Sequence, residues 1–216
     1  MRRSGVVIAG GRSRRMGGVD KRFLLLEGKP LLLRVIERLR PLVDEVLVVT
    51  RQPEARIAEW DVRQVVDRYP GHGVLAGVHA GLAAAHGAWA VVVSADLPFL
   101  SCPLLEGLLR RAESGVADVV IPRRGAGLEP LHALYRAATC APAAERAILR
   151  GERRIIAFFP FVRVDEVMPE TWRRWDAEGR SFFNVNRPQE WAQAVAMATP
   201  RGADDRGACR DASDGQ

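Results

Sequence analysis

The amino-acid sequence predicts an α/β protein, a three-layer sandwich in which helices cover both faces of a mostly parallel central sheet. Three runs of largely branched apolar residues, 6–9, 45–50 and 88–95, are typical of strands that are buried on both faces. Segments with the apolar spacing of helices lie between such runs, and this alternation favours a parallel sheet. In sheets of this kind, ligands bind beyond the carboxyl ends of the strands.

The other elements follow from periodicity and from turn-forming residues. Strands are expected at further apolar runs: 22–26, 62–66, 117–122 and 161–167, with 128–135 returning to the sheet or crossing it and 181–186 forming a strand or a loop. Helices are expected where apolar residues recur every three or four positions: from Leu31 to a stop at Pro41, and over 53–60, 74–86, 102–114, 139–149, 153–158 and 188–197.

Length and composition predict one domain, 1–198, followed by a tail. The 216 residues are 48% hydrophobic and 27% charged, which is ordinary for a globular protein. Apolar periodicity ends after residue 198, so we expect 199–216 to be disordered. No apolar run reaches the roughly 20 residues that a membrane span needs. Three widely spaced cysteines form neither a disulfide framework nor a metal motif, which favours a cytoplasmic location.

The net charge of +6 is compatible with nucleic acid or with a small anionic substrate. The arginines are dispersed along the chain, apart from a group that follows Gly10, and no aromatic RNA-binding signature accompanies them. We therefore expect no nucleic-acid partner and favour a small anion.

A glycine turn followed by cations ends the first strand. Gly10 and Gly11 allow a tight turn and let a ligand approach the backbone closely, and four cations follow: Arg12, Arg14, Arg15 and Lys21. Backbone N–H groups and converging cations are suited to a polyphosphate. The Walker loop and the G-x-G-x-x-G fingerprint are both absent. A plain turn with solvated arginines is therefore the alternative.

Carboxylates and amides mark the ends of other strands. Asp96 directly follows a strand, where a carboxylate suits Mg²⁺ bound together with phosphate oxygens. The alternative is a helix cap, for which Ser101 is better placed. Asp67 either contacts a nucleotide or forms a turn. Asn184 and Asn186 lie on the same side of a strand, or else they belong to a turn.

Four segments carry motifs in a fixed order. Residues 8–21 are similar to the signature L-A-G-G-x-S-x-R-M-G-x-D-K, and 70–77 to a G-P-L-A-G loop. Residues 96–99 match a D-x-P-F metal motif, and 183–190 are similar to a closing F-x-N-x-N-T-P-E. Over about residues 5–198 the chain thus resembles the nucleotidyltransferase superfamily, and within it the bacterial molybdenum cofactor guanylyltransferases.

The resemblance implies a Rossmann-like nucleotidyltransferase fold that joins GMP from GTP to the molybdopterin form of the molybdenum cofactor, with Mg²⁺ as cofactor and pyrophosphate as by-product. The GTP contacts it implies are Ile8, Ala9, Gly10, Gly11, Lys21, Asp67 and Asp96. The implied metal ligands are Asp96 and Asn186, and the implied acceptor contacts are Asn184, Asn186 and Arg187.

The expected catalytic residues are Arg15, Lys21 and Asp96. The acceptor phosphate attacks the α-phosphate of GTP. Arg15 and Lys21, together with Mg²⁺ held by Asp96, offset the repulsion between the two anions. No protein nucleophile is needed, because the attacking phosphate is already ionised.

Two other functions stay open. One is a cytidylyltransferase, or another nucleotidyltransferase acting on a related cofactor or on a sugar or polyol phosphate. The other is a non-catalytic carrier of nucleotide or cofactor. The expected partners are GTP and the molybdopterin cofactor. Whether proteins that deliver the product to molybdoenzymes also bind is left open. We expect no membrane partner and a monomer or weak oligomer.

Overall fold

A computed structural model describes residues 1–10, 20–69 and 71–198. The centre of the molecule is an eight-stranded sheet in the order β10-β7-β9-β6-β1-β4-β5, with β8 paired to β7. The strands of this sheet are β1 (Arg3–Ile8), β4 (Glu45–Thr50), β5 (Arg63–Val66), β6 (Trp89–Ser94), β7 (Val119–Arg124), β8 (Gly127–Leu128), β9 (His132–Arg136) and β10 (Val164–Val167). In the main order, β9 is antiparallel to both neighbours and the other pairings are parallel. The expected mostly parallel sheet is therefore confirmed.

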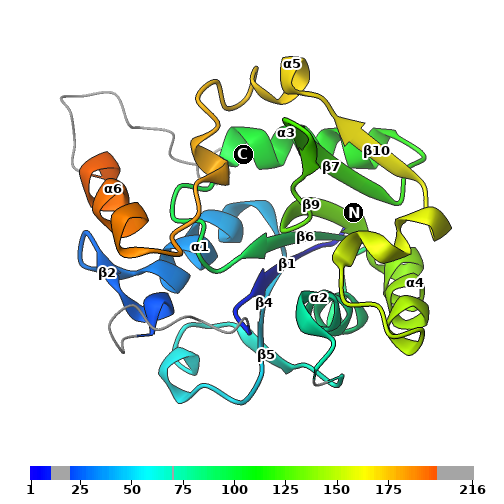
Figure 1. The fold of residues 1–216 in the computed structure, drawn as a ribbon, viewed down its shortest axis with the longest axis horizontal. Coiled ribbons are helices and arrows are strands. Elements are labelled where there is room, and N and C mark those ends of the chain that lie inside the picture. The colour runs from blue at the N-terminus through cyan, green and yellow to red at the C-terminus, as the bar shows by residue number, and fades with distance from the viewer. Residues whose placement is uncertain (11–19, 70, 199–216) are drawn as a thin grey trace, which may run out of the picture.

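Helices cover both faces of the sheet and complete the expected three layers (Figure 1). One face carries α1 and α3, and the other carries α2 and α4. The helices are α1 (Leu31–Leu39), α2 (Gly73–Ala84), α3 (Cys102–Ser114), α4 (Ala137–Leu149), α5 (Pro169–Trp172) and α6 (Pro188–Ala198). Among the described residues, no helix combines the length and the apolar character that crossing a membrane requires.

The alternation of side chains along each strand divides the core into two parts. Val7, Val48 and Val91 pack with α1 and α3, whereas Val6 and Leu47 pack with α2 and α4. All five are buried, as the continuous apolar runs predict for parallel strands. Helix α2 lies close against the sheet, because a Cβ added at Gly81 would overlap the side chain of Val6.

The segment 22–26 was expected to be a single strand, and this is wrong. Lys21–Phe23 forms a 3-10 turn capped by the carboxylate of Asp20, which accepts from the backbone N–H of Arg22. Strand pairing within this segment is limited to β2 (Leu25–Leu26), which pairs with β3 (Lys29–Pro30) in a two-residue hairpin. Both turn residues, Glu27 and Gly28, have positive φ, the conformation that such tight hairpins require.

Other boundaries also differ from the expectation. The helix expected over 53–60 is a 3-10 turn at Ala55–Ile57, and the one expected over 153–158 is a 3-10 segment at Ile155–Phe161. This segment reaches Phe161, so strand β10 begins only at Val164. Of the alternatives left open, 128–135 enters the sheet as β9, and 181–186 is a turn and loop. The predicted tail, 199–216, lies outside the described residues.

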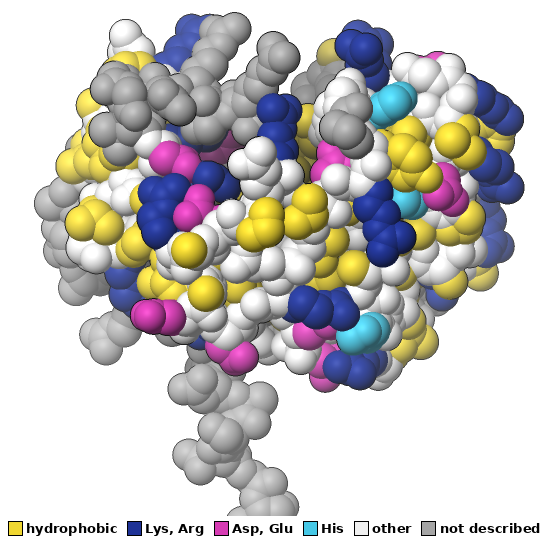
Figure 2. Space-filling view, turned by 90° about the horizontal axis from the view of Figure 1, so that it is seen from below, with side chains coloured by type: hydrophobic (Ala, Val, Ile, Leu, Met, Phe, Trp, Pro, Cys, Tyr) yellow, Lys and Arg dark blue, Asp and Glu magenta, His cyan; other side chains and the backbone are white. Residues whose placement is uncertain are grey.

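Helix α6 and the β2–β3 hairpin form a small cluster of their own beside the sheet (Figure 1). Leu26, Leu31, Val185 and Ala194 are buried together in this cluster. The view from below Figure 1, where β5 is the lowest strand, shows acidic and basic side chains intermixed on that face (Figure 2). The burial of Val185 in the cluster with Leu26, Leu31 and Ala194 fixes the loop that carries Asn184 and Asn186.

Candidate active site

The carboxyl ends of four adjacent strands are held together by backbone hydrogen bonds. The N–H of Ala95 donates to the carbonyl of Ile8 (3.1 Å), that of Ala9 to Val49 (2.9 Å) and that of Asp67 to Thr50 (3.3 Å). Four strands in the order β6-β1-β4-β5 span three strand spacings, roughly 14 Å. The predicted site residues on these strands therefore line one edge of the sheet, across which an elongated ligand would lie.

Lys21 lies at the centre of the candidate site. Its Nζ donates to Asp96 Oδ2 (2.6 Å), Asn186 Oδ1 (2.7 Å) and the carbonyl oxygen of Val185 (3.0 Å). The side chains of Lys21 and Asp96 are 14% and 13% exposed. The N–H of Val185 also donates to the carbonyl of Asp96 (3.0 Å), which ties the loop to the end of β6. The ammonium of Lys21 thus contacts Asn186, which lies 165 positions further along the chain.

The oxygens around Lys21 also fit a hard divalent cation. Asp96 Oδ1 is buried and has no hydrogen-bond partner among the described residues, so one carboxylate oxygen is available to a ligand. No group of three or more His, Cys, Asp or Glu side chains gathers in the described part of the chain. A cation at Asp96 and Asn186 would therefore complete its shell with water and phosphate oxygens, as Mg²⁺ does.

The first strand delivers backbone groups to the same edge. Ile8 and Ala9 are buried, and Gly10 is half-buried. The carbonyl of Ala9 accepts from Arg22 Nη1 (3.2 Å) and its N–H is bonded to Val49, so these backbone groups already have partners. The predicted contacts Gly11 and Arg15 lie outside the described residues.

Asp67 takes part in a turn, the alternative that the sequence left open. Its Oδ1 accepts from the N–H of Tyr69 (2.8 Å), while Oδ2 receives no hydrogen bond from the residues that the structure describes. The hydroxyl of Tyr69 donates to Glu145 on α4 (2.6 Å), which anchors the turn. One oxygen of Asp67 is thus fixed and the other is left for a ligand.

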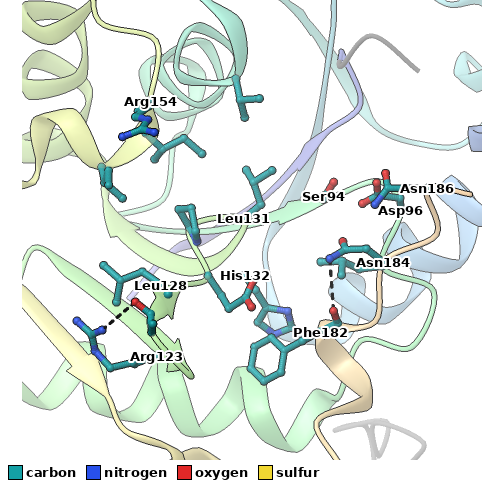
Figure 3. Close-up of a pocket in the computed structure, with 18 of the residues that line it drawn as sticks. Ser94, Asp96, Arg123, Leu128, Leu131, His132, Arg154, Phe182, Asn184 and Asn186 are labelled. Atoms are coloured by element: carbon teal, nitrogen blue, oxygen red, sulfur yellow. Dashed lines mark hydrogen bonds between the residues drawn. The ribbon is translucent and has the colours of Figure 1, made fainter. Parts of the chain in front are cut away.

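A cavity of about 800 Å³ opens beside Asp96. Asp96, Asn184 and Asn186 line one end, and Arg123 and Arg154 lie toward the opposite end (Figure 3). The wall between them is largely apolar, with Leu128, Pro130, Leu131, Ile155 and Ile156. The cavity therefore combines a largely apolar wall with arginine guanidiniums toward one end and a carboxylate and two amides at the other.

Arg187, a predicted acceptor contact, lies outside the wall of the cavity. The N–H of Arg187 donates to Glu190 (2.9 Å), and the N–H of Asn186 donates to the same carboxylate (2.5 Å). Glu190 thus caps the start of α6 with its carboxylate, which is the glutamate half of a capping box. Asn184 lines the cavity, and its Nδ2 donates to the carbonyl of Phe182 (3.4 Å).

Comparison with known proteins identifies the family. The model of the MobA-like NTP transferase domain matches residues 5–167, three quarters of the chain. The chain belongs to this family.

Relatives and a solved structure match over most of their lengths. The chain is 32% identical over 193 residues to the molybdenum cofactor guanylyltransferase of Desulfosudis oleivorans, covering 89% of the chain and 94% of the relative. It is 40% identical over 195 residues to the probable molybdenum cofactor guanylyltransferase of Opitutus terrae, covering 87% and 92%. The crystal structure of molybdopterin-guanine dinucleotide biosynthesis protein A from Archaeoglobus fulgidus matches with a TM-score of 0.76 and 33% identity, covering 90% and 97%.

This MobA-like NTP transferase is a nucleotidyltransferase, and its structure adds residues that sequence reasoning missed. Arg123, Arg153 and Arg154 line the cavity, and Arg22 contacts the end of β1. The two consecutive arginines at 153–154 could have indicated an anion-binding surface, but nothing in the sequence placed them on the wall of the same cavity as Asp96. Arg123 is paired with Glu166 (2.6 Å), which raises its pKa.

His132 is a further missed residue of the MobA-like domain. It lies at the start of β9 in the wall of the cavity and is 1% exposed. Burial lowers its pKa to about 3, so the ring is neutral. Its Nε2 shares a hydrogen bond with Ser181 Oγ (3.2 Å), and that oxygen accepts from the N–H of Ser101 (2.9 Å). His132 thereby holds the segment that leads to Asn184.

Proposed function

We propose that this protein transfers GMP from GTP to the molybdenum cofactor, forming the guanine dinucleotide cofactor and pyrophosphate. The observation that carries the proposal is the position of Lys21, whose Nζ joins Asp96 at the end of β6 to Asn186 beside the cavity. A phosphate donor at the strand ends and an acceptor in the cavity would therefore meet at one cation. Relatives named for this activity at 32–40% identity support the choice of substrates.

The chemistry is an in-line exchange at phosphorus. An oxygen of the acceptor's terminal phosphate forms a bond to the α-phosphorus of GTP, and the bond from that phosphorus to the bridging oxygen breaks, releasing pyrophosphate. When a divalent cation takes the oxygens of Asp96 and Asn186, the Lys21 ammonium would be released to donate to the phosphate oxygens on which charge accumulates. Asp96 and Asn186 would hold Mg²⁺, which neutralises phosphate charge when it is bound. Asp67 Oδ2 is available for a donor group of the nucleoside.

The cavity receives the acceptor in this proposal. The terminal phosphate would lie at Asn184 and Asn186 and the pterin along the apolar wall, with Arg154 toward the far end. We include Arg153 and Arg154 among the acceptor contacts, because cations on the cavity wall favour an anionic ligand. Arg187 contributes to acceptor binding from the rim in this proposal, through its long side chain.

The proposal includes one catalytic domain over 1–198, a monomer or weak oligomer, and the cytoplasm as the location where GTP is available. Transfer of the product to molybdoenzymes through a delivery protein is part of the same proposal. Each of these points is separate from the chemistry and has its own test, beginning with the molecular mass in solution.

The deciding experiment measures pyrophosphate release with molybdenum cofactor as acceptor and each of the four nucleoside triphosphates in turn, with and without Mg²⁺. We expect release with GTP and Mg²⁺, and loss of at least a hundredfold in Asp96→Asn. A preference for CTP would identify a cytidylyltransferase. Binding of GTP and cofactor with no pyrophosphate release would identify a carrier, and full turnover by Asp96→Asn would refute the metal assignment.

A further inference from the structure

Arg22 joins three parts of the nucleotide side of the site. Its Nη1 donates to the carbonyl of Ala9 at the end of β1 (3.2 Å), and its Nε and Nη2 contact the carboxylate of Asp20 (2.5–3.0 Å). Nη2 also lies 3.3 Å from Glu54 Oε2, in the connection from β4 to β5. The side chain is only 18% exposed. Nothing in the chemistry described above requires an arginine at this position.

The turn that carries Arg22 also carries Lys21, and the two side chains have different partners. Lys21 contacts Asp96 and the loop at Val185, on the β6 side. Arg22 contacts the end of β1 and the β4–β5 connection. The 3-10 turn at Lys21–Phe23 is therefore held from two directions, and a change in one attachment alters where the other side chain lies.

The surroundings of Arg22 keep its partners ionised and in place. Burial opposes ionisation of Asp20, but hydrogen bonds from Arg22 outweigh it and lower the pKa of Asp20. Arg56 pairs with Glu54 (2.8 Å) and its guanidinium lies 3.5 Å over the ring of Phe23. The backbone of Glu54 is fixed in turn, since its N–H donates to Gln64 on β5 and its carbonyl accepts from the same side chain.

We propose that Arg22 is a positioning residue for the nucleotide: its guanidinium sets the distance between the end of β1 and the turn that places Lys21 against the triphosphate. Arg22 uses separate nitrogens of one rigid plane, with Nη1 on the carbonyl of Ala9 and Nε and Nη2 on the carboxylate of Asp20. A lysine has one nitrogen on a flexible stem, so it does not hold these two partners at the same separation. This inference deepens the proposed function and rests on nucleotide binding at the ends of β1 and β6.

The test compares Arg22→Lys with Arg56→Lys. Arg56 contacts the same two carboxylates but makes no contact with Ala9 among those that the structure describes, and it is 53% exposed. We expect Arg22→Lys to raise the Kd for GTP with Mg²⁺, measured by calorimetry, about tenfold, and to raise KM for GTP while KM for the acceptor and kcat change less than threefold. Arg56→Lys is expected to change the Kd less than threefold.

A double-mutant cycle separates positioning from independent binding. If Arg22 acts through Lys21, then Arg22→Lys adds less than a twofold loss of GTP affinity in a Lys21→Met background. The same tenfold loss in both backgrounds would overturn the proposal, as would unchanged affinity in a folded Arg22→Lys protein. Arg22→Gln is the second variant, and unfolding of both variants would assign Arg22 to stability and refute a positioning role.

The nucleotide series keeps this test distinct from that of the proposed function. If the wild-type protein prefers CTP, the guanylyl assignment fails, and the same comparison of variants with CTP still decides the role of Arg22. If the wild-type protein binds no nucleoside triphosphate, both the proposed function and this inference are wrong.

Discussion

Lys21 and a divalent cation compete for the same oxygens, which leads to an unusual expectation. The ammonium of Lys21 has three N–H groups, and each has an acceptor: Asp96 Oδ2, Asn186 Oδ1 and the carbonyl of Val185. Replacing Lys21 by Met removes this internal cation and leaves the oxygens without a counter-charge. We therefore expect Lys21→Met to bind a divalent cation more tightly than the wild-type protein when no nucleotide is present.

The size of the effect follows from the contacts that the cation must displace. A hydrogen bond to a charged group contributes about 1.5–3 kcal/mol net. The Lys21–Asp96 pair, at 2.6 Å and with both side chains at most 14% exposed, belongs in that range. Since 1.4 kcal/mol corresponds to a factor of ten, removing the competitor lowers the Kd of the cation about 10–100-fold.

The assay is a titration with Mn²⁺, followed by the loss of its free electron paramagnetic resonance signal. Mn²⁺ prefers the same carboxylate and carbonyl oxygens as Mg²⁺. Asp96→Asn, alone and combined with Lys21→Met, is the control that removes the carboxylate and should abolish the gain. Unchanged or weaker Mn²⁺ binding in a folded Lys21→Met protein would show that these oxygens are not a cation site.

Three further predictions concern stability, measured by urea unfolding with tryptophan fluorescence. Because His132 is neutral when folded, with a pKa of about 3 against 6.5 when exposed, its contribution to stability is present above pH 6.5 and falls by about 2 kcal/mol by pH 5. His132→Leu should remove this contribution from the slope, and that of His79, whose pKa burial also lowers, should remain. Burial alone would raise the pKa of Asp118, but the hydrogen bonds from Arg163 outweigh burial, and the pKa of Asp118 is lowered. Asp118→Asn should therefore reduce the free energy of unfolding by about 2–3 kcal/mol at pH 7, and by progressively less as pH falls below about 4. Gly107→Ala should cost about 1–3 kcal/mol with kcat/KM unchanged, because the added methyl overlaps the ring of Trp175. A wild-type stability that does not change between pH 6.5 and 5 would contradict the argument for His132. A loss of stability in Asp118→Asn that is the same at all pH values would contradict the argument for Asp118, and a Gly107→Ala protein as stable as the wild type would contradict the argument for Gly107.

Local sequence patterns were sufficient for most elements of the sheet and its helices. The strand Glu45–Thr50 and the helix Cys102–Ser114 have the predicted bounds, because apolar runs and turn-forming neighbours determine both ends. The direction of β9 was not predictable, since an apolar run is the same whether its neighbours are parallel or antiparallel. The 3-10 turn at Lys21–Phe23 depends on a side-chain cap from Asp20, which competes with the strand preference of the residues that follow.

The candidate site was predictable in part for the same reason. Asp67 and Asp96 were expected at one sheet edge because parallel strands share a direction, and the backbone hydrogen bonds place them there. The meeting of Lys21 with Asn186 depends on a long intervening chain and on the packing of Val185. Arg22, the arginine that we propose positions the turn, has no motif around it, because its partners Ala9 and Glu54 come from separate segments.

The antiparallel strand β9 divides the sheet into two parts that carry different groups of residues. On one side, β5, β4, β1 and β6 carry the residues expected to handle the triphosphate, and on the other, β9, β7 and the 3-10 segment at Ile155–Phe161 form the far wall of the cavity. The two parts are joined by the antiparallel β6–β9 ladder, from Trp89 opposite Arg136 to Val93 opposite His132, and beyond it the N–H of Ser94 donates to the carbonyl of Leu131 (3.1 Å). Substitutions that reshape the far wall leave the four parallel strands intact. The wall of the cavity and the edge that carries Asp67 and Asp96 are thus built largely from different segments of the chain.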